Sequence, residues 1–424
     1  MLHPAAVLNE PLTLPNGTRL PNRIAKAAMS ECLGDVGLSP TARHTQLYRR
    51  WSGGGAGLLI TGNIMIDRSA IGEVGNVVVD DRRDLAILAA WAAAARSDGA
   101  HVWAQINHPG KQIPLTLNSR PVAPSPIPIT GPTALFRRPR ELTHNEILEI
   151  IDKFGHSAEI LIEAGFTGIE IHAAHGYLIN QFLSPLSNTR TDHWGGSAEK
   201  RHRFLLEVVR AVRARIGPQI PLAVKLNSAD FQRGGFGENE SAQVVRALAC
   251  EGIDLLEISG GTYELGTPTQ SLKASTASRE AYFLDFAERI RTLTSVPILL
   301  TGGFRTAAAM AEAISSGAID VVGLARPLVL DPLLPSRLLN GYAGVSTIEP
   351  RRIGISFLDG ATELTWHTTQ LWRLAEGKTL DSNAHPARTL ITYFSRLFPY
   401  LLHRLTTAAT ESNMWSRRTS NASR

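Results

Sequence analysis

Eight short strand-like runs, most of them separated by helical patterns, constrain the fold of this chain more than any other feature. The runs cover residues 23–27, 56–61, 101–106, 168–171, 221–226, 254–259, 297–301 and 318–323. Helical patterns lie between them at residues 40–51, 82–98, 144–163, 197–216, 240–251, 279–293 and 306–316. Apolar strands that alternate with amphipathic helices predict a parallel sheet, and eight such units predict an α/β fold of the (β/α)8 TIM-barrel type.

Three segments lie outside this repeat. The Asn16-Gly17 dipeptide stands between two short alternating runs, which predicts an N-terminal β-hairpin that closes the bottom of the barrel. The Pro-rich segment 109–140 predicts a long loop or cap after the third strand. We therefore expect a barrel at residues 1–345, a helical extension at 346–406 that packs back on the barrel, and a disordered basic tail at 407–424.

Composition narrows the class of protein. The chain of 424 residues has no apolar run of membrane-span length, and no signal peptide is visible at its start, so we expect a cytoplasmic protein. Its two cysteines, Cys32 and Cys250, predict neither a disulfide framework nor a metal site. Residues 386–424 contain six arginines, no lysine and one glutamate, which equals the chain's whole net charge of +5. The body is therefore neutral, and nucleic-acid binding has no support.

The fourth apolar run leads into a cluster of polar rings. The chain leaves the strand at His172, and His175 and Tyr177 follow within five residues. A strand end that feeds such a loop is typical of a catalytic or ligand-binding site. The alternatives are a metal site or hydrogen-bonded core histidines. We expect the nearest carboxylate, Glu170, to point away from the histidines, which disfavours a metal.

Other strand ends carry chemistry of two further kinds. Lys225 lies within the apolar fifth run, and a buried lysine in a barrel can form a Schiff base with a carbonyl substrate, as in an aldolase. Gly302 and Gly303 follow the seventh run and precede a helix, and Arg326 follows the eighth. Backbone N–H groups and a guanidinium at these two positions predict a phosphate site, hence a bound mononucleotide.

The polar-ring cluster also carries a family resemblance. From His172 the chain reads His-Ala-Ala-His-Gly-Tyr-Leu-Ile-Asn-Gln-Phe-Leu-Ser-Pro, with Asn-Thr-Arg-Thr-Asp at 188–192 and Trp-Gly-Gly-Ser at 194–197. This order resembles the single-domain FMN type of the Old Yellow Enzyme family of NAD(P)H:flavin oxidoreductases, over roughly residues 8–340. The resemblance implies non-covalent FMN at the barrel mouth, NADPH or NADH as hydride donor, and reduction of activated C=C bonds in enones, enals or nitroalkenes.

The resemblance also assigns roles to residues. It places Ser30 beside the flavin C4 carbonyl, Gln105 on the pyrimidine edge and Lys225 near N1 and O2. Gly62 would leave room for the isoalloxazine and Asn63 would touch it, although many relatives have Glu-Ala there. The full set of expected cofactor contacts is Ala27, Ala28, Met29, Ser30, Gly62, Asn63, Gln105, Lys225, Gly302, Gly303, Ala325 and Arg326.

For the reaction, the resemblance implies that His172 and His175 hydrogen-bond the substrate oxygen and that Tyr177 protonates the α-carbon. A phenol suits that role because its ordinary pKa is about 10, which keeps it protonated at neutral pH. Two alternatives stay open: an FMN-binding barrel without alkene turnover, such as a redox sensor or scaffold, and an aldolase that uses Lys225. We expect Arg190 and Asp192 to form a structural pair within the loop.

The region near the C-terminus predicts an amphipathic helix over residues 389–406. Its apolar face comprises Leu390, Phe394, Leu397, Phe398, Leu401, Leu402 and Leu405. Its other face comprises Arg388, Thr392, Arg396 and His403, and Pro399 is expected to kink or break the helix. We expect the apolar face to dock on the barrel or on a second protomer, as in a homo-oligomer. Contact with an anionic membrane surface is the alternative.

Overall fold

The computed structural model describes residues 3–117, 120–129, 136–261, 280–344, 356–396, 398–400 and 402. Its centre is a closed barrel in which every neighbouring pair of strands is parallel. In chain order the strands are β3 (Ile24–Lys26), β4 (Leu58–Ile60), β6 (His101–Asn107), β9 (Gly168–Ala173), β10 (Leu222–Asn227), β11 (Leu255–Ser259), β12 (Ile298–Thr301) and β13 (Val321–Leu324). Pairing of β13 with β3 closes the ring, so the predicted (β/α)8 barrel is confirmed.

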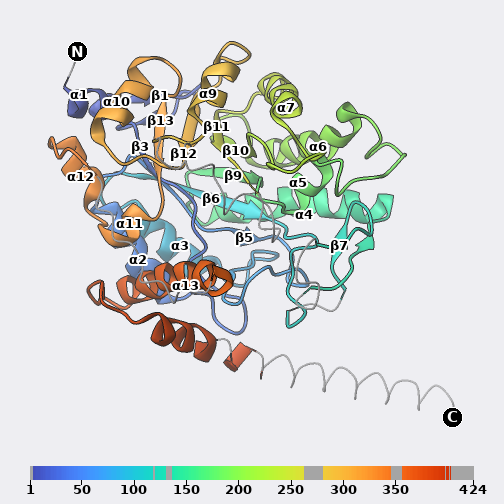
Figure 1. Cartoon of the computed structure of the whole chain (residues 1–424), viewed down its shortest axis with the longest axis horizontal. Coiled ribbons are helices and arrows are strands. Elements are labelled where there is room, and N and C mark those ends of the chain that lie inside the picture. Colours follow the sequence, from blue (N-terminus) through green and yellow to red (C-terminus); the bar gives the residue numbers. More distant parts are fainter. Residues whose placement is uncertain are drawn as a thin grey trace.

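Helices cover the outside of the barrel (Figure 1). They are α2 (Ala42–Ser52), α3 (Leu85–Ala95), α4 (His144–Glu163), α6 (Ala198–Ile216), α7 (Glu238–Cys250), α9 (Leu284–Arg291) and α10 (Ala307–Ser315), one in each predicted helical segment. At the start of α4, Thr143 and Glu146 form a capping box. The sequence analysis missed the shorter elements α1 (Pro4–Asn9), β5 (Ile64–Met65), α5 (Leu178–Leu183), α11 (Pro327–Leu330) and α12 (Leu334–Leu339).

The predicted hairpin closes the amino-terminal end of the barrel. Its strands β1 (Leu12–Thr13) and β2 (Arg19–Leu20) pair antiparallel around the Asn16-Gly17 turn. Leu12, Leu14 and Leu20 pack in one apolar cluster with barrel residues such as Trp103. Because the hairpin fills this end, a ligand site is left to the carboxyl ends of the strands.

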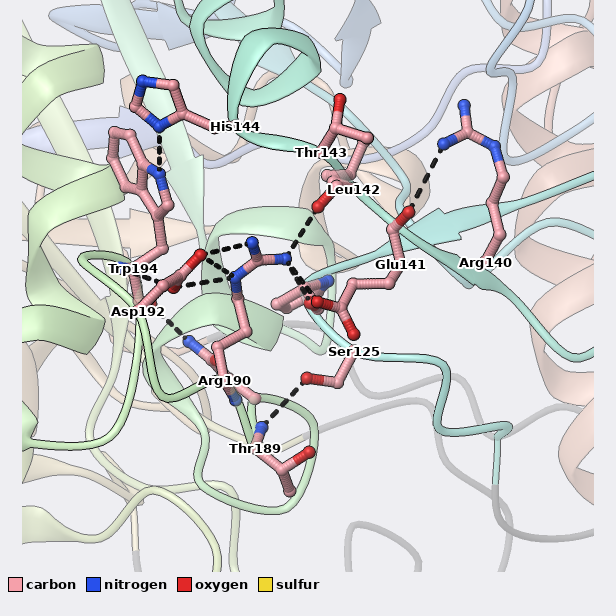
Figure 2. Close-up of polar contacts among 12 residues, drawn as sticks. Ser125, Arg140, Glu141, Leu142, Thr143, His144, Thr189, Arg190, Asp192 and Trp194 are labelled. Atoms are coloured by element: carbon pink, nitrogen blue, oxygen red, sulfur yellow. Dashed lines mark hydrogen bonds and ion pairs between the residues drawn. The ribbon is translucent and has the colours of Figure 1, made fainter.

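Two short strands lie in the long segment after β6. Its described part contains β7 (Val122–Ala123) and β8 (Arg140–Glu141), which pair in parallel. Figure 2 shows the guanidinium of Arg190 between Asp192 on one side and Leu142 and Glu141 on the other. Its Nη1 donates to the carbonyl oxygens of Pro124 and Leu142 at 2.9 and 2.7 Å, while Nε donates to Asp192 at 3.0 Å. The structural role predicted for this pair is confirmed, because it fastens the cap to the loop after α5.

The C-terminal extension contains α13 (Ser356–Ala375), which runs along one edge of the molecule (Figure 1). Leu371, Trp372 and Leu374 of this helix are buried in the main core, so the extension packs on the barrel. The predicted boundary at 345 and the predicted disordered tail lie outside the described residues.

A further helix covers residues 386–396. It contacts the rest of the protein through Tyr393 and Arg396, not through the predicted apolar face. The Tyr393 ring stacks on the Trp372 ring with centroids 5.7 Å apart, and the Arg396 guanidinium lies 4.3 Å from the same ring. Arg396 also pairs with Glu376. Phe394 and Phe398 remain 59% and 66% exposed. The expectation that the apolar face docks on the barrel is therefore wrong, because stacking and ion pairing on Trp372 and Glu376 orient the helix. Pro399 lies among helical residues 398–400.

Candidate active site

Strand β9 ends in the polar-ring cluster, and the structure brings its three members together. The centroid of the His172 ring lies 5.1 Å from that of His175 and 4.9 Å from that of Tyr177, edge to face in both pairs. His172 and Tyr177 are only 4% and 6% exposed. The predicted catalytic residues thus form one compact group at the carboxyl end of the barrel.

A strained turn aims these side chains. His175 adopts a φ of +59°, which is uncommon outside glycine, and Gly176 follows at +76°. The His175 N–H donates to Oδ1 of Asn227 at 3.2 Å, and the Gly176 N–H donates to Oδ1 of Asn180 at 2.7 Å. Both amide groups in turn donate to Asp230. The sequence analysis missed this supporting network, although Asn227 stands at a strand end beside the cluster.

Hydrogen bonding fixes the tautomer of His172. Its Nδ1 accepts from the N–H of Ala174 at 3.2 Å, so a neutral ring carries its proton on Nε2. Burial lowers the pKa of His172 well below its ordinary value, and the neighbouring His175 and Lys225 lower it further. The ring is therefore neutral at physiological pH and presents Nε2–H as a donor.

His175 has a different partner. Its Nε2 lies 2.8 Å from the hydroxyl oxygen of Ser259 at the end of β11. Burial lowers the pKa of His175 to about 3, with a smaller effect of Lys225. If Ser259 donates to Nε2, the proton of the neutral ring lies on Nδ1. Ser259 thus holds the ring of His175 in position.

Glu170 does not point away from the histidines, as the sequence had predicted. It lies two residues before His172 on β9, so both side chains point to the same side of the strand. Its carboxylate accepts from the amide of Gln105 at 2.6 Å inside the barrel. The described residues nevertheless contain no group of three or more His, Cys, Asp or Glu side chains that could hold a metal ion.

Lys225 lies on β10, the strand next to β9, and its side chain is buried. Its ammonium donates to Glu257 at 2.8 Å, and both residues are almost fully buried. Burial raises the pKa of Glu170 well above its usual range, and the adjacent Glu257 adds to the rise. Burial also acts to raise the pKa of Glu257, but Lys225 and hydrogen bonds bring it below the ordinary value. We infer an ionised Glu257 beside a protonated Glu170. The ion pair stabilises the charged lysine, which disfavours Schiff-base chemistry.

The loops that follow β3 and β4 are joined by a side-chain hydrogen bond. Ala27 hydrogen-bonds to Leu324 of β13, and the chain continues through Ala28 and Met29 to Ser30. The Ser30 hydroxyl donates to Oδ1 of Asn63 at 3.0 Å. The structure gives a reason for Gly62 within the protein itself, beside the predicted room for the isoalloxazine. A Cβ there would lie 2.0 Å from a carboxylate oxygen of Glu31 and 2.3 Å from the carbonyl oxygen of Met29. Glycine is required here mainly by the backbone carbonyl of Met29, which cannot move aside as the Glu31 side chain can.

Gly302, Gly303 and Arg326, the predicted phosphate-binding residues that we name the phosphate end, lie in two strand-to-helix turns, after β12 and after β13. Gly302 and Gly303 adopt φ values of +132° and +84°, which favour glycine. The Tyr282 and Phe283 rings pack over them, a contact that the sequence did not predict. Ala325 leads to Arg326 at the start of α11, where the exposed guanidinium pairs with Glu363 of α13. Arg326 thus follows β13, the strand next to that of the two glycines, and its guanidinium has a carboxylate partner.

Comparison with known proteins decides the family. Residues 7–343 match the model of the NADH:flavin oxidoreductase / NADH oxidase family. The chain belongs to this family. Its members include the Old Yellow Enzymes, so the protein is a flavin-dependent NAD(P)H oxidoreductase of that type, with FMN as cofactor and NADH or NADPH as hydride donor.

Individual relatives agree with this membership. The chain is 38% identical over 355 residues to "NADH-dependent flavin oxidoreductase iliE" of Hypocrea jecorina, covering 78% of this chain and 88% of that one. Among solved structures, "Morphinone reductase" matches with a TM-score of 0.66 and 26% identity, over 81% of this chain and 91% of that one. A 2-naphthoyl-CoA reductase complex matches with a TM-score of 0.75 and 27% identity, over 80% of this chain but only 52% of that one.

The residues present fit FMN in this flavin oxidoreductase. Gln105 offers an amide that both donates and accepts, and Lys225 offers a buried positive charge inside the same barrel. Gly302 and Gly303 offer backbone in a conformation that allows close approach, and Arg326 offers a guanidinium nearby. The donor set therefore suits a molecule with a polar heterocyclic edge at one end and a phosphate at the other.

Proposed function

We propose that this flavin oxidoreductase reduces C=C bonds conjugated to a carbonyl or nitro group, with His172, His175 and Tyr177 as its substrate-contacting residues. The observation that carries the proposal is the hydrogen bond from Ala174 to Nδ1 of His172. It leaves a neutral imidazole with its proton on Nε2, and the Tyr177 ring lies beside it. A neutral donor and a phenol, held together in a buried site, suit a substrate that gains negative charge on oxygen and then a proton on carbon.

The residues that would hold the cofactor are Gln105, Lys225 and Ser30, together with the phosphate end. FMN supplies a carrier that accepts hydride from NAD(P)H and returns it to the β-carbon of the alkene. Gln105 and Lys225 would contact its pyrimidine edge, and Ser30 would lie near its C4 carbonyl. Gly302, Gly303 and Arg326 would bind its phosphate.

The histidines act on the substrate oxygen. His172 Nε2–H would donate to the carbonyl or nitro oxygen, where negative charge develops during hydride transfer. His175, oriented by Ser259 and Asn227, would supply the second donor. The same two rings would first hold the carboxamide of the nicotinamide, so that one pocket serves both substrates in turn. Tyr177 would then deliver its phenolic proton to the α-carbon.

Anaerobic reduction followed by reoxidation tests this proposal. The purified holoprotein is titrated with NADH or NADPH, and the flavin absorbance is followed until it is bleached. Addition of 2-cyclohexenone or a nitroalkene should restore the absorbance and give one saturated product per flavin. An FMN-binding barrel without turnover would be bleached but not reoxidised by any alkene, and that result would refute the proposal. A colourless protein would point back to the aldolase alternative.

A further inference from the structure

The helix at 386–396 and the turns after it are oriented by one face only. Tyr393 and Arg396 both lie on the ring of Trp372, and Arg396 pairs with Glu376. Four residues further on, the hydroxyl of Tyr400 donates to the backbone carbonyl of Gly34. These contacts recur at helical spacing, so they fix which side of the helix faces the barrel.

The opposite side presents an apolar stripe to solvent. Ile391, Phe394, Phe398 and Leu402 follow one another at intervals of three, four and four residues, all in helical positions. Their exposed fractions are 70%, 59%, 66% and 53%. We name these four residues the C-terminal apolar face. Burial of such large apolar side chains away from water is favourable, so an apolar partner gains from covering the face.

The net charge of residues 386–424 indicates which kind of partner would cover the C-terminal apolar face. Residues 386–424 carry six arginines and one glutamate, whereas the other 385 residues sum to zero. Arg388, on the same helix, is exposed. A second copy of this chain, seated face to face, would bring another strongly basic segment to the same contact, and like charges would repel. An anionic lipid surface accepts both the apolar stripe and the positive charge.

We propose that the C-terminal apolar face binds the surface of an anionic lipid membrane. The helix would lie in the plane of the interface, with Phe394 and Phe398 in the region between headgroups and acyl chains and the arginines near the lipid phosphates. The barrel would stay attached through Trp372, Tyr393 and Arg396. In the described residues no helix is long and apolar enough to cross a membrane.

Vesicle co-sedimentation of the full-length holoprotein tests the proposal. We expect binding to phosphatidylcholine vesicles that contain phosphatidylserine, little binding to phosphatidylcholine alone, and a marked loss when salt is raised from about 0.1 to about 1 M. The double variant Phe394→Ser/Phe398→Ser should bind at least about tenfold more weakly. Leu364→Ser is the matched control, because Leu364 is 55% exposed on α13 outside the face. It should bind like the wild type.

Other outcomes overturn the proposal. It fails if the wild type does not sediment with anionic vesicles at low salt, or if the double variant and the control lose binding equally. It also fails if sedimentation velocity shows a dimer that the double variant converts to a monomer, because the occupant is then a second copy. A second pair, Ile391→Ser/Leu402→Ser, guards against misfolding of the first. Flavin absorbance and the melting temperature of each variant report that the barrel is intact.

Discussion

The indole Nε1 of Trp372 donates a hydrogen bond of 3.0 Å to the backbone carbonyl of Glu31, which joins α13 to the segment beside the predicted flavin contact Ser30. The side chain of Glu31 accepts from the Gly62 N–H at 2.8 Å and from the Tyr48 hydroxyl. The C-terminal extension therefore braces the ends of β3 and β4, where the cofactor is expected to lie.

Trp372→Phe should loosen this brace. The substitution keeps an aromatic ring but leaves the Glu31 carbonyl without its donor, so we expect a loss of about 1–3 kcal/mol in unfolding free energy and faster loss of FMN on dialysis. Trp103→Phe is the control. Its buried Nε1 has no hydrogen-bond partner among the described residues, and it lies in the cluster at the opposite end of the barrel. Retention of FMN by Trp372→Phe equal to that of Trp103→Phe would argue against the brace.

Buried neutral histidines should make stability depend on pH. Burial lowers the pKa of His44 from its ordinary value of 6.5 to about 3. Between about pH 6.5 and 3 the unfolded chain binds a proton there that the native state lacks, so the unfolding free energy falls as the pH falls. His44→Gln should reduce the slope by up to one proton, about 1.4 kcal/mol per pH unit.

Urea unfolding at several pH values between about 7 and 5 measures this slope. The comparison uses the slope rather than the stability, because His44 also accepts from the Thr41 N–H at the start of α2 and its loss costs a cap. His193→Gln, which removes an exposed histidine, is the control. An identical slope in His44→Gln and wild type would mean that His44 is not buried in its neutral form.

The barrel was predictable from sequence because its signals are local and repeated. The runs that became β4 and β12, for example, are apolar and bounded by glycine or proline, and α4 begins at the capping box of Thr143 and Glu146. Elements of a single turn or two, such as α5 and α11, carry too few residues to show a period. Their positions depend on tertiary contacts.

The residues of the candidate site could be proposed from the sequence, but only part of their arrangement could be predicted. His172, His175 and Tyr177 follow from one continuous motif. The partnership of Lys225 with Glu257, the hydrogen bond of His175 to Ser259 and the reason for Gly62 join residues that are distant in sequence. The docking of the C-terminal helix was predicted on the wrong face, since a helical projection counts apolar residues and does not show that Trp372 can bind Tyr393 and Arg396.

Glu257 should partly neutralise the positive charge of Lys225 beside the cofactor. Glu257→Gln removes the negative partner, so we expect the flavin midpoint potential to rise by about 30 mV, which corresponds to a tenfold change in a two-electron equilibrium. Glu170→Gln is the matched control, because burial and Glu257 keep the pKa of Glu170 well above its usual range and the substitution changes no charge. Equal shifts in the two variants, or no shift in Glu257→Gln, would contradict this assignment.

Arg326 should contribute to retention of FMN. Arg326→Ala removes a charge-assisted hydrogen bond of about 1.5–3 kcal/mol, which predicts an FMN dissociation constant raised by about 10- to 100-fold. Glu363→Gln instead removes the carboxylate partner of the guanidinium, so FMN should bind as tightly as in the wild type, or more tightly. Fluorescence titration of the deflavinated protein measures both. Full flavin occupancy of Arg326→Ala after extensive dialysis would remove Arg326 from the phosphate site.

Tyr177→Phe, studied by anaerobic stopped-flow, tests the central claim most directly, because the phenylalanine ring can keep the packing against His172 while the proton is lost. Reduction of the flavin by NAD(P)H should proceed at nearly the wild-type rate. Reoxidation by 2-cyclohexenone should be slower by about 10²- to 10⁴-fold, the usual contribution of a general acid. Equal slowing of both half-reactions, or an unchanged rate of reoxidation, would contradict proton transfer from Tyr177 to the alkene.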